Sequence, residues 1–105
     1  RDGVGIDPHQ ELAAGRERLQ SAVARARGDL AEAVHLLTEA ARVAASAGAP
    51  LHTQAEIERD LGDALAARGD HAGARAARER GLALFRRLGA RQATEALESL
   101  LSTAQ

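Results

Sequence analysis

The chain of 105 residues contains no cysteine, methionine, tryptophan, tyrosine or lysine, and Phe85 is its one aromatic residue. Without cysteine there are no disulfides and no thiolate metal sites, which fits a cytoplasmic protein. The lack of cysteine and tyrosine also removes two side chains that serve as catalytic nucleophile or acid. These absences lead us to expect a structural or binding role rather than an enzymatic one.

Long apolar runs and excess charge are absent as well. No stretch approaches the roughly 20 apolar residues that a membrane-spanning helix needs, and no signal-peptide pattern opens the chain. The net charge of −1 indicates neither a nucleic-acid nor a membrane-surface partner. Because the sequence starts at Arg1 and has no methionine, we expect it to be a segment of a longer protein.

Alanine and leucine dominate what is present, with 26 and 14 residues respectively. Both are strong helix formers, whereas the β-branched residues valine and isoleucine are scarce. The composition therefore predicts an all-α fold. Since each alanine buries little apolar area, we expect a thin core of modest stability.

The chain repeats part of itself after 41 residues. Residues 26–49 and 67–90 share eight of 24 positions, including the first four and the last two. An αα-hairpin of this kind cannot bury its own apolar stripe, so two stacked copies would complete one core. The repetition therefore predicts stacked helical hairpins.

Glycine and aspartate divide the chain into segments. Glycine is favoured just past the end of a helix and aspartate just before the start of one. Connections of a few residues make consecutive helices antiparallel. We predict an irregular lead-in at residues 1–7 and a helical repeat domain at 8–105, with helices at 8–27, 29–47, 52–68, 70–88 and 91–103.

Apolar and small residues recur at helical spacing in each predicted helix and mark its inward face. The stripe of the first helix comprises Leu12, Leu19, Val23 and Ala26, and that of the second Ala33, Leu37, Ala40, Ala41 and Ala44. The third carries Ile57, Leu61, Ala64 and Leu65, and the fourth Ala74, Ala77, Gly81, Leu84, Phe85 and Leu88. The fifth shows Leu97, Leu100 and Leu101.

Several of these positions resemble a tetratricopeptide repeat over residues 10–105. Leu61-Gly62, Leu65 and Ala74 stand where that motif has Leu-Gly, a large residue and a small one, and Gly81 occupies a second small position. In the earlier copy Ser21, Ala33, Leu37 and Ala40 match. Glu58 and Arg78 replace aromatic residues of the motif, and the period exceeds the usual 34.

The resemblance implies a short right-handed superhelix of about five helices. Long repeats rich in alanine, arginine and glycine are similar to the C-terminal regions of actinobacterial antibiotic-regulatory and large LuxR-type transcription regulators. The implied role is a non-enzymatic protein–protein interaction module within a larger bacterial regulatory protein. Its partner would be a protein, a peptide or another domain of the same chain.

In such superhelices the first helices of the hairpins build a concave wall. The resemblance places seven residues on it: Arg18, Ala22, Arg25, Glu56, Arg59, Asp63 and Ala66. A mixed-charge wall suits a peptide or partner helix, although solvent exposure alone would also explain these residues. The alternative role is homodimerisation or assembly without a groove ligand, because Leu97, Leu100 and Leu101 exceed what one neighbouring helix can bury.

No pattern points to a cofactor, a metal or a catalytic centre. The histidines, His9, His35, His52 and His71, are not paired at helical spacing, so we expect them to be exposed to solvent. The two Arg-Gly-Asp triplets, at 27–29 and 68–70, are interpreted as a helix end followed by a helix start. The arginine clusters lack interleaved aromatics for base stacking and are interpreted as solvated faces.

Overall fold

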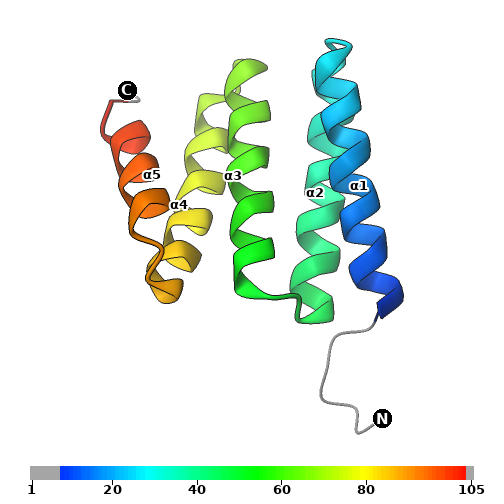
Figure 1. Ribbon diagram of the computed structural model, residues 1–105. Coiled ribbons are helices and arrows are strands. Elements are labelled where there is room, and N and C mark those ends of the chain that lie inside the picture. The colour runs from blue at the N-terminus through cyan, green and yellow to red at the C-terminus, as the bar shows by residue number, and fades with distance from the viewer. Residues whose placement is uncertain (1–7, 104–105) are drawn as a thin grey trace, which may run out of the picture.

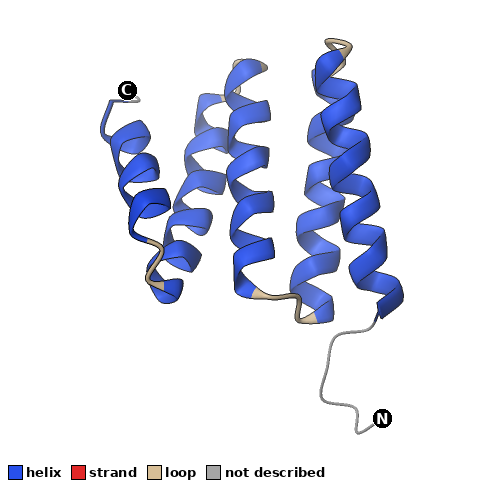
Figure 2. Cartoon of the chain, viewed as in Figure 1, coloured by secondary structure: helices blue, strands red, loops and turns tan. Residues whose placement is uncertain are grey.

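The computed structural model describes residues 8–103, with the side chains of residues 15–103. This part of the chain consists of five helices and no strand (Figure 2). The helices are α1 (Pro8–Ala26), α2 (Leu30–Ala47), α3 (Leu51–Ala67), α4 (His71–Leu88) and α5 (Arg91–Thr103). The predicted all-α class and five helices are confirmed, and each boundary lies within one residue of its predicted place. The lead-in predicted for residues 1–7 lies outside the described residues.

The glycines and aspartates that were predicted to divide the chain explain where the helices begin and end. Gly28, Gly48, Gly69 and Gly89 have φ angles of 80°, 69°, 90° and 70°, a left-handed conformation that only glycine adopts without strain. The Asp29 carboxylate accepts a hydrogen bond from the Glu32 backbone N–H at 3.1 Å. The Asp70 carboxylate accepts one from the Gly73 N–H at 2.9 Å. Both aspartates therefore act as N-caps.

The turns of the two copies have the same hydrogen bonds. The Asp29 N–H donates to the Ala24 carbonyl at 2.8 Å, and 41 residues later the Asp70 N–H donates to the Leu65 carbonyl at 2.9 Å. At the other end of each copy, two further bonds correspond in the same way: Ala49 N–H to Ala44 carbonyl at 2.9 Å and Ala90 N–H to Phe85 carbonyl at 3.0 Å. Equal spacing in the sequence thus produces equal turn geometry.

The helices follow one another side by side in chain order, from α1 to α5 (Figure 1). Each helix packs against the next one along the chain. The shortest dimension of the molecule is 18 Å, which accommodates about two layers of helices, each about 10 Å wide. Short turns between neighbours make successive helices run in opposite directions.

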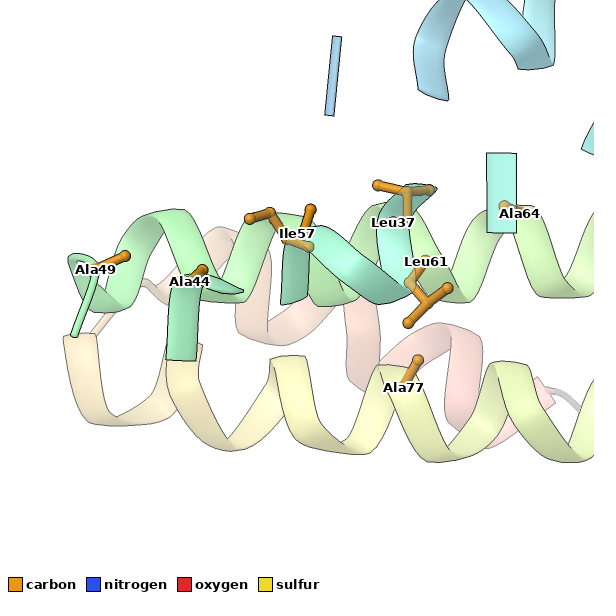
Figure 3. Packing of buried hydrophobic residues seen from close by; sticks show 8 residues of the cluster. Leu37, Ala44, Ala49, Ile57, Leu61, Ala64 and Ala77 are labelled. Carbon is orange, nitrogen blue, oxygen red and sulfur yellow. The ribbon is translucent and has the colours of Figure 1, made fainter. Parts of the chain in front are cut away.

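The larger core cluster joins the first hairpin, α1 and α2, to the second hairpin, α3 and α4. Leu37, Ala40 and Ala44 of α2 meet Ile57, Leu61 and Ala64 of α3, and Ala77 of α4 closes the cluster (Figure 3). Leu37 and Ile57 have no exposed surface. Alanine on both sides lets the helix backbones approach closely. Residues of α3 and α4 therefore help to bury Leu37, Ala40 and Ala44 of α2.

A smaller cluster joins α4 to α5. It contains Leu82 and Phe85 of α4, Leu97 of α5 and Ala55 of α3. Phe85 and Leu97 are each 1% exposed. The one aromatic side chain thus packs against the last helix and not against the first hairpin.

The predicted inward face of α1 is wrong. Leu19 is 68% exposed and Val23 50% exposed, Ala26 is exposed, and the side chain of Leu12 lies outside the described residues. Two small residues, Ser21 and Ala24, are buried instead. Ser21 satisfies its hydroxyl within the helix by donating to the Arg18 carbonyl at 2.6 Å. Close approach through small side chains therefore decides how α1 packs.

Leu88 is also more exposed than predicted, at 40%. Leu88 lies in the last turn of α4, while α5 covers the face of α4 that carries Leu82 and Phe85. Leu82, which the predicted stripe omits, is 8% exposed. The direction in which α5 leaves the turn therefore determines which leucines of α4 are buried.

Candidate functional site

A groove of about 560 Å³ lies where α1 approaches α3 across α2. In Figure 1, α2 lies between the other two helices. We call this groove the α1–α3 groove. Its lining residues are Gly15, Arg18, Leu19, Ser21, Ala22 and Arg25 of α1, Leu37 of α2 and Asp60 of α3. It combines the exposed apolar side chains of Leu19 and Ala22 with charged side chains.

Arg18 connects the two walls of the α1–α3 groove. Its Nε donates to Asp60 Oδ2 at 2.8 Å, and its Nη1 donates to Glu56 Oε1 at 2.9 Å. Burial acts to raise the pKa of Glu56, but the hydrogen bond and the charge of Arg18 outweigh it and lower that pKa. The Glu56 carboxylate is therefore held ionised, and both carboxylates fix the position of the Arg18 guanidinium.

Other side chains extend this charge network along α3. His52 Nε2 lies 2.8 Å from Glu56 Oε2, and Arg59 Nε lies 3.7 Å from Asp60 Oδ1. Arg59 also places its guanidinium carbon 6.0 Å from the centre of the Phe85 ring, within cation–π distance. The face of α3 around Glu56 and Asp60 therefore carries both signs of charge.

Asp63 faces α4 instead of the groove. Its Oδ1 accepts a hydrogen bond from Arg78 Nη2 at 3.1 Å, and the Arg78 side chain is only 11% exposed. Gly62 provides the space for it, since a Cβ there would lie 2.7 Å from Arg78 Cγ. Arg78, which replaces an aromatic residue of the repeat motif, thus packs between α3 and α4.

The structure brings together part of the predicted wall. Arg18, Ala22 and Arg25 line the α1–α3 groove, and Glu56 and Arg59 join its charge network. Asp63 pairs with α4, and Ala66 is half-buried in the last turn of α3. Sequence reasoning missed Asp60. The available signal was its position one turn after Glu56, which places both carboxylates on the same face.

A second groove, of about 400 Å³, lies between α1 and α2 at the end of the molecule. We call it the α1–α2 groove. Its lining residues are Leu19, Gln20, Val23, Ala24 and Arg27 of α1 and its turn, and Glu32 and Leu36 of α2. The sequence interpretation assigned Leu19 and Val23 to the core, so this groove was not predicted.

The residues predicted for self-association are not equivalent. Leu97 is buried against Phe85 within the same chain, so it is not available to a second copy, and this assignment is corrected. Leu101 is half-buried, and only Leu100 is exposed. One leucine of α5, not three, therefore offers apolar surface.

The remaining observations concern the histidines, metal binding and membrane crossing. His35, His52 and His71 are exposed, whereas the side chain of His9 lies outside the described residues. In the range the structure describes, no cluster of histidine, aspartate and glutamate could hold a metal ion. None of the described helices has the length and apolar character needed to cross a bilayer.

No protein-family model, curated protein or solved structure matches the chain.

Proposed function

We propose that this chain is a non-enzymatic protein–protein interaction module that holds a peptide or partner domain in the α1–α3 groove. The observation that carries the proposal is the convergence of Arg18, Arg25 and Asp60 around the exposed apolar side chains of Leu19 and Ala22. An apolar groove with a few fixed polar groups suits an apolar side chain of a partner and oriented hydrogen bonds at the rim.

The charges of the groove define the partner's chemistry. Asp60 and Glu56 already hold Arg18, whereas Arg25 is exposed and pairs with no carboxylate among the described side chains. Arg25 is therefore open to an acidic residue of a partner. A peptide with an acidic residue next to an apolar one matches this arrangement.

The wider setting of the module follows from its repeats. Matching turns in the two copies support a tetratricopeptide-like array, and the resemblance described above assigns that array to a larger, cytoplasmic bacterial regulator of transcription. In that setting the occupant is another protein or another domain of the same chain. No cofactor and no nucleic acid take part.

A displayed peptide library tests the groove. Sequences selected on the chain should share an acidic residue near an apolar one, and Arg25→Glu and Ala22→Glu should weaken their binding by at least about tenfold. Arg87→Glu is the matched control, because Arg87 is exposed in the last turn of α4. Binding that survives both groove variants, or that fails equally in the control, would contradict the proposal.

The second candidate function is homodimerisation or assembly without a groove ligand. Leu19 and Val23 at one end of the molecule, and Leu88 and Leu100 at the other, are exposed large apolar side chains. Light scattering over a range of concentrations tests this function. A dimer that Leu19→Glu or Leu100→Glu dissolves, while groove peptides still bind, would show that both functions coexist.

A further inference from the structure

The α1–α2 groove corresponds to a surface on α3 and α4 that another helix of the chain covers. In the second hairpin, formed by α3 and α4, the corresponding surface is occupied by α2, which packs on Leu61 and Ala64 of α3 and on Ala77 of α4. Subtracting the 41-residue offset from these three positions gives Gln20, Val23 and Leu36. All three line the α1–α2 groove.

From this correspondence we infer that the α1–α2 groove binds an amphipathic helix built like α2 of this same chain. The contact stripe of α2 is one leucine followed by two alanines, Leu37, Ala40 and Ala44. The groove presents larger apolar side chains, Val23 and Leu36, where the second hairpin has Ala64 and Ala77. A helix with small residues on its contact face leaves room for them.

Charge favours the same occupant. Residues 15–28 carry four arginines and one glutamate, a net charge of +3, whereas residues 29–49 carry three carboxylates and one arginine, a net charge of −2. In the existing contact α2 runs antiparallel to α3, so the same docking on α1 would bring an acidic first turn towards Arg27. No carboxylate in the described part of the chain pairs with Arg27, although Glu32 lines the same groove.

This inference does not rest on the proposed function, because Val23 and Leu36 line the α1–α2 groove but not the α1–α3 groove. The two sites share Leu19, so that residue is left unchanged in the test. A failure of peptide selection in the α1–α3 groove and a failure of helix docking in the α1–α2 groove are therefore separate results.

The probe is a labelled synthetic peptide of residues 29–49, titrated with the whole chain while its fluorescence polarisation is followed. We expect saturable binding that Val23→Asp and Leu36→Asp each weaken by at least about tenfold. Leu100→Asp is the matched control at the far end of the molecule, because Leu100 is 40% exposed and Val23 50%. Circular dichroism of each variant is the check that it remains folded.

Two peptide variants add an independent readout that does not alter the fold of the chain. Ala40→Asp in the peptide places a charge on the contact stripe and should abolish binding. Ala45→Asp places the same charge on the exposed face of α2 and should bind as the parent peptide does.

Three results would overturn the inference. The first is the absence of saturable binding. The second is binding that Val23→Asp and Leu36→Asp do not weaken, since the peptide would then be displacing the resident α2. The third is a dimer of the chain that Val23→Asp dissolves, because the groove's occupant would then be a second copy.

Discussion

Arg18 holds two carboxylates of another helix at once. Glu56 and Asp60 lie one turn apart on α3, and the guanidinium hydrogen-bonds to both at 2.9 and 2.8 Å. Without it, two negative charges would face each other at a half-buried site. The contact is therefore both a link between α1 and α3 and a screen between two like charges.

Replacing Arg18 with methionine keeps most of the side-chain volume and removes the charge. We expect a loss of roughly 1–2 kcal/mol in the free energy of unfolding, as for a half-buried charged hydrogen-bond pair. Urea denaturation at neutral pH measures it. Arg42→Met is the control, because the Arg42–Glu39 pair is exposed and within one helix, and it should change stability little.

The Arg18 contribution should depend on pH. The pKa of Glu56 is lowered in the folded chain, so its stabilisation is complete above the ordinary glutamate pKa and is lost as pH falls through the folded value. The difference between the parent chain and Arg18→Met should therefore shrink at about pH 3. An unchanged difference at that pH would show that the pair does not act through the Glu56 charge.

The pKa of Glu58 is shifted in the opposite direction to that of Glu56. Its burial raises its pKa, and the nearby Arg80, at 3.1 Å, offsets this only partly. The folded state therefore disfavours the charged form, and stability falls as pH rises from the ordinary pKa through the raised one.

Glu58→Gln should stabilise the chain at neutral pH by up to about 1 kcal/mol, because an amide avoids the desolvation of the charge. The gain should vanish in acid, where Glu58 is protonated in both states. Thermal unfolding at the two pH values measures it. Glu79→Gln is the control, because the Glu79 side chain is 55% exposed, and an equal shift there would contradict the role of burial.

Local residue signals could be predicted from the sequence, while distant pairs could not. Asp29, Asp70 and the turn glycines act within five residues of their own positions, so their types alone indicate caps and ends. The Arg18–Asp60 bond joins residues 42 positions apart. Many charged pairs are possible at that separation, and packing alone selects one.

Among the elements, α3 and α4 approach closely because Gly62 has no side chain. The Arg78 side chain crosses that position, and a Cβ at residue 62 would lie 2.7 Å from its Cγ. The Cγ is near the backbone of Arg78, so it cannot move aside as a flexible end could. The helix pair is thus matched to glycine at this position.

Gly62→Ala should therefore destabilise the chain by about 1–3 kcal/mol, although alanine is the better helix former by about 1 kcal/mol. Gly15→Ala should stabilise it by about 0.5–1 kcal/mol, because no atom lies within 4 Å of a Cβ there. Chemical denaturation of both variants measures the contrast. Gly62→Ala should recover stability when combined with Arg78→Ala; no recovery would assign the loss to something other than this clash.

Helix existence was predictable from the sequence, but the face of α1 was not. Its large residues, Leu19 and Val23, suggested the inward stripe, yet Ser21 and Ala24 are buried. Periodicity indicates which residues share a face. It does not show whether large or small side chains set the distance to the next helix. The α1–α2 groove escaped prediction for the same reason.

Across the whole molecule, the core is divided between two clusters that share α3 and α4. Among the side chains that the structure describes, only four large ones are fully buried, Leu37, Ile57, Phe85 and Leu97. Each of them therefore carries an unusual share of the apolar burial. Because the core is thin, truncating one of these side chains should lower the stability of the whole chain.

Leu97→Ala should cost about 2–4 kcal/mol, since it leaves a cavity beside Phe85. Leu100→Ala should cost less than about 1 kcal/mol, because that side chain is partly exposed. Thermal denaturation of the two variants measures the difference. Equal losses would show that α5 packs differently in solution.

The matching turn bonds at Ala49 and Ala90 make residues 49–89 an insertable unit. If a copy of that segment were inserted after Gly89, its first residue would follow a glycine as Ala49 follows Gly48. Its last residue would be followed by Ala90 and the turn that now leads into α5. Array length is thus open to engineering without designing a new loop.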